Sequence, residues 1–131
     1  HASAKEIALH IAEMEVIGFS HGVTGGLLGE KWSLTQELKE VIRRHHEFDR
    51  AQSSLELVAL VNVADLLCRF RGLDYGFAER KAVCFSTEPS FALLAEKFPL
   101  LWRTDLEKLT FELDGYIDEV KGLVSVLFRM R

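Results

Sequence analysis

The sequence has few residues of the kinds that build disulfide scaffolds, loop-rich folds or membrane spans. It contains 2 cysteines and 2 prolines in 131 residues, and Cys68 and Cys84 lack the close spacing of a metal-binding cysteine pair. No apolar run is long enough to cross a bilayer, and the first residues show no signal-peptide pattern. These absences argue against a disulfide-bonded secreted protein and a membrane-spanning protein, and they favour the reducing cytoplasm.

An excess of positive charge is also missing. The chain has 16 Lys and Arg against 20 Asp and Glu, for a net charge of −4. A surface that binds nucleic-acid phosphates normally carries clustered Lys and Arg in excess. Because this excess is missing, we expect no nucleic-acid partner. The sequence also contains no internal repeat, no phosphate-binding glycine loop and no serine-nucleophile elbow.

The residues that are present predict helices. The composition, 48% hydrophobic and 27% charged, is ordinary for a globular protein, and apolar residues recur at helical spacing. An amphipathic helix is expected before Gly18, with His10 off its apolar stripe and exposed, and Ser20 is the expected N-cap of the next helix. The alternation typical of strands appears nowhere over a useful length. The sequence therefore predicts an all-α fold.

The last expected helix is long and carries a heptad seam, because its apolar residues alternate steps of three and four. The seam residues are Leu106, Leu109, Leu113, Tyr116, Val120, Leu123, Leu127 and Met130. Such a seam requires a partner helix, which we expect from the missing first half of the domain upstream or from a second protomer. We therefore expect a protein partner or self-association through this helix.

Three polar side chains lie on helix faces that are otherwise apolar and are therefore predicted to be buried. His21 shares a stripe with Leu28 and Trp32, His45 ends the apolar stripe of the following helix, and Asp65 lies in a helix that is apolar nearly all round. Buried imidazole and carboxylate groups are costly unless they are paired or bound to metal. We therefore expect these three polar side chains to converge.

The neighbouring histidines His45 and His46 point about 100° apart on an ideal helix. Two such histidines seldom serve one ion, so the doublet fits a binuclear site better than a mononuclear one, and His46 is expected at the rim. Taken singly, each histidine is more often a satisfied core residue than a ligand. Taken together with His21 and Asp65, they favour a present or ancestral polar site.

Four glycines crowd the helix that carries His21. They are Gly22, Gly25, Gly26 and Gly29. A glycine inside a helix costs roughly 0.5 to 1 kcal/mol relative to alanine. The pattern therefore predicts that another backbone packs closely against this helix.

The same region carries a family resemblance. Its residues are Glu15, Gly18, His21, Gly25, Trp32, Leu34, His45, His46 and Asp65. This pattern resembles the second half of an HDOD domain, a relative of the HD and HD-GYP phosphohydrolases. The likeness covers most of the chain and implies one HD-domain-like helical bundle over residues 1–131 with a long C-terminal helix. Because the chain begins in the middle of the pattern, we expect further helices upstream.

The resemblance also implies a ligand set. In metal-binding relatives the corresponding residues are ligands, which implies His21, His45, His46 and Asp65 as metal ligands here and a divalent cation such as Fe, Mn, Ni or Mg. The chain departs from the active pattern, because no histidine is followed by aspartate and the GYP element is absent. The complete hydrolytic site uses the missing His-Asp dyad, so we expect no catalytic residue in this chain.

Three functional hypotheses follow. The first is a regulatory, signal-transducing HDOD module that binds partners without catalysis, with a remnant metal-site pocket. The second is a metal-dependent phosphohydrolase or cyclic-dinucleotide phosphodiesterase whose His-Asp dyad lies upstream. The third is a helical oligomerisation module, suggested by the seam. The sequence upstream would separate the first two, and stoichiometric metal in the purified protein would weigh against the third.

Overall fold

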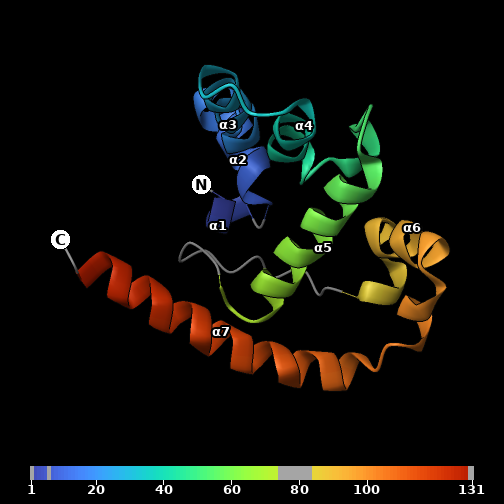
Figure 1. Cartoon of the computed structure of the whole chain (residues 1–131). Coiled ribbons are helices and arrows are strands. Elements are labelled where there is room, and N and C mark those ends of the chain that lie inside the picture. The colour runs from blue at the N-terminus through green and yellow to red at the C-terminus, as the bar shows by residue number, and fades with distance from the viewer. Residues whose placement is uncertain (1, 6, 74–83, 130–131) are drawn as a thin grey trace. The chain divides into compact units, whose positions relative to one another are not determined.

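The computed structural model describes residues 2–5, 7–73 and 84–129. All regular structure in these ranges is helical, and no strand occurs in them, so the all-α prediction with a long C-terminal helix is confirmed (Figure 1). The chain groups into two compact units, 1–97 and 98–131, which are described separately. The single domain expected over residues 1–131 stays a prediction.

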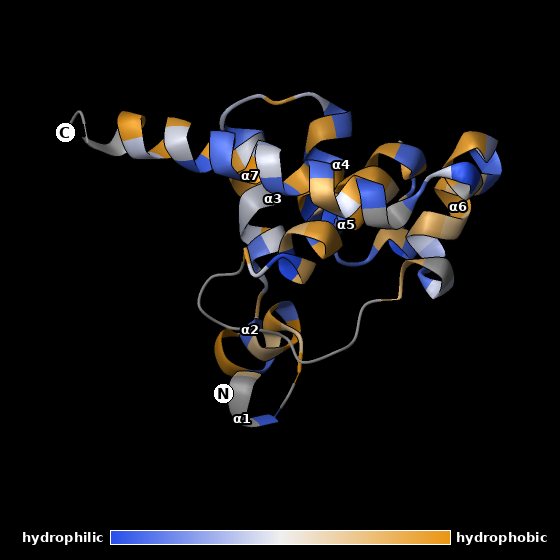
Figure 2. Ribbon diagram, turned by 90° about the horizontal axis from the view of Figure 1, so that it is seen from below, coloured by the Kyte–Doolittle hydropathy of each residue, from blue (hydrophilic) through white to orange (hydrophobic). Residues whose placement is uncertain are grey.

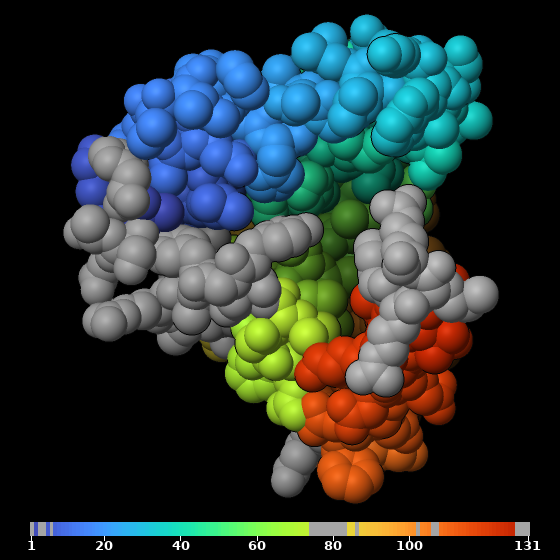
Figure 3. All heavy atoms as spheres, turned by 90° about the vertical axis from the view of Figure 1, so that its left-hand side faces the viewer, coloured from blue at the N-terminus to red at the C-terminus, as the bar shows by residue number. Residues whose placement is uncertain are grey.

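The first unit is a series of helices that pack in chain order. Its elements are α1 (Ala2–Lys5), α2 (Leu9–Ile17), α3 (His21–Lys31), α4 (Gln36–Arg44), the 3-10 turn η1 (Phe48–Arg50), α5 (Leu55–Phe70), the 3-10 turn η2 (Phe85–Thr87) and α6 (Pro89–Lys97). Helix α3 packs against α2 and α4, and α5 packs against α4 and α6. Figure 3 shows α2, α3 and α4, from blue to cyan, as one continuous surface.

Capping residues determine where the histidines lie, and two of them, Gly18 and Ser20, were expected from the sequence. Gly18 ends α2 with a φ of 81°, a left-handed conformation that glycine adopts without steric cost. The side chains of Ser20 and Thr35 each accept a backbone N–H in the first turn of α3 and α4. His21 is therefore the first residue of α3, and His45 directly follows the last residue of α4.

The core of the first unit lies between α5 and α6. Its buried apolar residues on these helices are Val58, Ala59, Val63, Leu66, Phe91, Leu94 and Ala95. The pattern of α5 predicted burial nearly all round, but Leu60 is 54% exposed. The reason is that α4, α6 and η1 cover only part of the surface of α5.

A buried polar network connects this core to the end of α4. The Asn62 side chain on α5 donates to the His45 carbonyl at 2.6 Å and accepts from the Ser90 hydroxyl of α6 at 2.7 Å. Ser90 is fully buried and Asn62 is 9% exposed. Since buried polar groups need partners, this network fixes the backbone at the histidine doublet.

We predict that Asn62→Ala lowers the free energy of unfolding by about 2 to 4 kcal/mol, because the Ser90 hydroxyl and the His45 carbonyl both lose their partner. Urea denaturation followed by circular dichroism would measure the loss. The control is Ala64→Ser, at an exposed position on the same helix, where a change within roughly 0.5 kcal/mol is expected. Equal effects of the two substitutions would contradict the structural role of Asn62.

The glycines of α3 form the surface against which α4 packs, as the sequence predicted. A Cβ added at Gly22 would lie 3.0 Å from the Arg43 carbonyl oxygen, and one added at Gly25 would lie 2.6 Å from the Ile42 Cγ2 atom. Gly22, Gly26 and Gly29 are buried. The absence of side chains on this face lets the two helices approach closely enough for His21 and His45 to meet.

The apolar stripe of α3 was expected to be its buried face, and this expectation was wrong. Leu28 is 42% exposed and Trp32 is 66% exposed, whereas the glycine face is covered by α4. Close backbone approach, and not the largest apolar side chains, decides which side of this helix is buried. His21 nevertheless faces inward, because it lies at the start of the helix beside α2.

The second unit consists of the 3-10 turn η3 (Pro99–Arg103) and helix α7 (Leu106–Arg129). Apolar and polar residues alternate along α7 (Figure 2). The seam residues Tyr116, Val120, Leu123 and Leu127 are exposed, between 57% and 67%. The last expected seam position, Met130, lies outside the described residues.

No helix within the described ranges has both the length and the apolar character that crossing a bilayer requires.

Candidate metal centre

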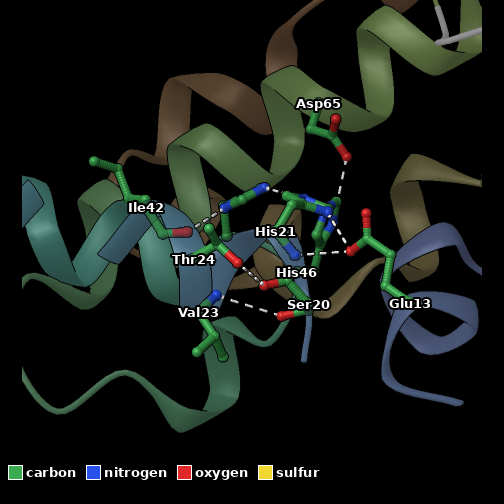
Figure 4. A network of polar contacts seen from close by, with 9 residues as sticks. Glu13, Ser20, His21, Val23, Thr24, Ile42, His46 and Asp65 are labelled. Carbon is green, nitrogen blue, oxygen red and sulfur yellow. Dashed lines mark hydrogen bonds and ion pairs between the residues drawn. The ribbon is translucent and has the colours of Figure 1, made fainter. Parts of the chain in front are cut away.

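Three histidine side chains, one from the start of α3 and two from the residues that follow α4, converge on one point. Figure 4 shows two of them, His21 and His46. Among the described residues, His21, His45 and His46 form a group in which one ligand atom from each lies within 4.8 Å of the others. The His21 Nε2 atom is 3.4 Å from His45 Nε2 and 2.9 Å from His46 Nε2. We call these three residues the histidine group.

The opposite ring nitrogen of each histidine faces an oxygen. His21 Nδ1 lies 2.7 Å from the Glu13 carboxylate, and His45 Nδ1 lies 2.9 Å from the Ile42 carbonyl. A carbonyl or an ionised carboxylate can only accept, so these two Nδ1 atoms carry the hydrogen. In the neutral imidazoles of His21 and His45 the Nε2 atoms therefore present lone pairs to the centre of the group.

A neutral His46 ring that carries its hydrogen on Nε2 can donate to the His21 Nε2 lone pair at 2.9 Å, and a metal ion between the nitrogens is the alternative. Protonation of His46 is disfavoured, because burial lowers its pKa to about 3, with further lowering from the nearby His45, His10, His21 and Arg69. The His46 side chain is 17% exposed. The Nε2 lone pairs of His21 and His45 point toward one centre, so the group offers nitrogen ligands for a cation there.

The donor atoms fit a metal ion of the kind that imidazole prefers. Two nitrogens bound tetrahedrally to one zinc ion at 2.0 to 2.1 Å lie about 3.3 Å apart, close to the 3.4 Å between the Nε2 atoms of His21 and His45. Metal-binding histidines usually donate their other N–H to a carboxylate or a backbone carbonyl. His21 and His45 do so here. The residues present are therefore compatible with a bound divalent metal.

Asp65 lies on the far side of His46 from the other two histidines. Its Oδ2 atom is 3.6 Å from His46 Nδ1 and 3.1 Å from Arg69 Nε on the same helix. The carboxylate that the sequence placed among the ligands thus contacts the histidine group through the back of the His46 ring (Figure 4). His46, expected at the rim, is less exposed than His21, whose side chain is 38% exposed.

Two residues near the group were not recognised from the sequence. Glu13 of α2 accepts both the backbone N–H of His21 at 2.8 Å and its Nδ1–H. His10 was expected to be exposed, but it is half-buried, and its ring stacks on His46 with centroids 4.6 Å apart. The sequence near Glu13 and His10 does not reveal these contacts, because each side chain meets a histidine of another segment only when α2 packs in the folded chain.

We predict that Glu13→Ala weakens zinc or cobalt binding about 10- to 100-fold, because His21 loses the carboxylate that sets its tautomer and orientation. Titration of metal-stripped protein would measure the affinity, and nitrogen NMR shifts of His21 would report the tautomer. The matched control is Glu15→Ala, on the same helix as Glu13, which removes an exposed ion pair with Lys5 of α1. If both variants bind metal like the unaltered protein, Glu13 has no positioning role.

Comparison with known proteins adds one finding. The model of the HDOD domain family matches residues 1–48, a span that contains the whole histidine group. No curated protein and no solved structure matches the chain. The resemblance of this sequence to HDOD domains is therefore confirmed over residues 1–48.

Proposed function

We propose that this chain is a regulatory HDOD module whose histidine group binds one divalent cation as a structural or sensory element, without catalysing hydrolysis. The observation that carries the proposal is the convergence of three Nε2 atoms, two of which belong to rings held from behind by oxygen acceptors. A cation at this point would join the start of α3 to the end of α4.

The donor set favours particular metals. All three ligand atoms of the group are imidazole nitrogens, which suit zinc, iron, nickel and copper, whereas magnesium and manganese prefer oxygen donors. Of the cations expected from the family resemblance, iron and nickel fit these nitrogens better than magnesium or manganese. Asp65 supports His46 from behind in this proposal, and one ion at the centre replaces the binuclear site favoured by the sequence.

The charged groups around the histidines support a non-catalytic role. Glu13 is committed to two hydrogen bonds with His21, and Asp65 is paired with Arg69. Hydrolysis by a metal centre requires a firmly held ion and a bound water that becomes hydroxide. Within the described part of the chain, no carboxylate oxygen joins the histidine group, and the sequence has no His-Asp dyad.

One observation favours a second candidate, a metal-dependent phosphohydrolase. Three histidine ligands leave further coordination positions open, as in catalytic zinc sites. In that case the remaining ligands would come from a His-Asp dyad outside this chain. The two candidates agree on metal binding and differ in whether a phosphoester is cleaved.

The test is to strip the purified chain of metal, titrate it with cobalt and zinc, and assay the loaded protein on generic phosphoesters and cyclic dinucleotides. We expect about one equivalent of metal, a cobalt absorption spectrum typical of nitrogen ligands, and no hydrolysis with zinc, iron, nickel or manganese. Hydrolysis that disappears in His45→Ala would replace the regulatory role by the enzymatic one. Failure to bind zinc or cobalt at millimolar concentration would refute the metal site itself.

A further inference from the structure

The apolar seam of helix α7 is exposed to solvent over most of its length. Among the seam residues whose side chains the structure describes, Leu109 and Leu113 are half-buried, and the four that follow are exposed. Monomeric proteins rarely expose a continuous apolar surface of this kind, and such surfaces mark interaction sites. The seam therefore requires an occupant, and its pattern indicates a helix.

The charges of α7 indicate what that helix is. Residues 106–119 contain five acidic side chains and one basic side chain, for a net charge of −4, whereas residues 120–129 contain two basic side chains and no acidic one, for a net charge of +2. Two copies of α7 side by side in parallel would place the acidic segments against each other. Two antiparallel copies would place each acidic segment beside the basic end of its partner.

We propose that α7 pairs with α7 of a second copy of this chain as an antiparallel two-stranded coiled coil. One register, centred on Asp118, brings the six seam residues from Leu109 to Leu127 into facing layers. The facing pairs are Leu109 with Leu127, Leu113 with Leu123 and Tyr116 with Val120, each occurring twice by symmetry. The six layers span the described seam, and the ends of the helices attract by opposite charge.

The first test is the oligomeric state of the full chain by sedimentation equilibrium from about 1 to 200 μM. We expect a dimer for the unaltered protein and a dimer at least about 100-fold weaker for Leu123→Lys, because both copies lose a buried leucine and gain a charge in the seam. The control is Ser125→Lys, which changes an exposed residue of the same helix outside the seam and leaves the dimer intact. Circular dichroism would show that the variants keep their helices.

The second test is the direction of pairing, in a background in which Cys68 and Cys84 are replaced by serine. Leu109→Cys combined with Leu127→Cys should form disulfide-linked dimers on mild oxidation. Leu109→Cys alone should not, because in the antiparallel pair its two thiols lie roughly 27 Å apart. Efficient cross-linking of the single variant would overturn the antiparallel arrangement. A monomer at 200 μM, or a dimer unaffected by Leu123→Lys, would overturn the proposal and assign the seam to another protein.

Discussion

Replacing His45 by alanine should abolish zinc and cobalt binding at micromolar concentration, with an affinity loss of at least about 1,000-fold. His45 supplies one of three nitrogens, and its ring is held for this by the Ile42 carbonyl. Two imidazoles hold an ion far less firmly than three preset ones. In the unaltered protein, zinc at 100 times its dissociation constant should raise the free energy of unfolding by about 2.7 kcal/mol. In His45→Ala this stabilisation should be absent.

The informative companion variant is Asp65→Asn. Asp65 faces His46 Nδ1 at 3.6 Å and not the centre of the histidine group, so we expect its replacement to weaken binding about tenfold, the size of an outer-shell effect. A loss as large as that of His45→Ala would show that Asp65 binds the metal directly, as the family resemblance implied. An affinity unchanged in His45→Ala would remove His45 from the site.

Gly22→Val should destabilise the first unit by about 3 kcal/mol and weaken metal binding at the same time. A Cβ at this position would already lie 3.0 Å from the Arg43 carbonyl oxygen and 3.3 Å from the Ile42 carbonyl oxygen. These are backbone atoms, so α4 as a whole must move away from α3. Overpacking of this kind typically costs 1 to 3 kcal/mol or more, and it outweighs the roughly 0.5 to 1 kcal/mol that is gained by removing a helical glycine.

The matched control is Gly115→Val in α7, where a Cβ would meet no atom within 4 Å. We expect its urea midpoint to stay close to that of the unaltered protein. Metal affinity is measured below the unfolding transition, so that a loss in Gly22→Val reports the separation of His21 from His45. If Gly22→Val and Gly115→Val are equally stable, close packing of α3 on α4 contributes nothing to stability.

The helices were predictable because their signals are local. Ser20, Thr35 and Gly18 mark helix ends through their own side-chain or backbone chemistry, and these marks agree with the observed ends of α2, α3 and α4. The glycines of α3 also predicted a close neighbour correctly, because a row of missing side chains is a property of the sequence itself. The heptad seam of α7 likewise required only the spacing of its apolar residues.

Other features were not predictable because they depend on which helix lies opposite. Trp32 shares the periodicity of a buried stripe but is exposed, since α4 packs on the glycine face instead. His10 lies off the apolar stripe of its own helix, yet its ring is covered by His46. Helical periodicity describes one helix at a time, so it cannot identify the neighbour that covers a given face.

The sequence by itself determined the helical class, the helix ends that place His21 and His45, and the candidate residues of the histidine group, since propensity, capping and residue type act over one or two turns. Only the tertiary structure decided which nitrogen each ring presents and where the carboxylates act. Glu13 and Asp65 lie 8 and 19 residues from the histidines that they face. Their positions behind the rings follow from the packing of α2 and α5. The hydrogen bond on one side of an imidazole sets which nitrogen carries the hydrogen, so this packing decides the tautomer.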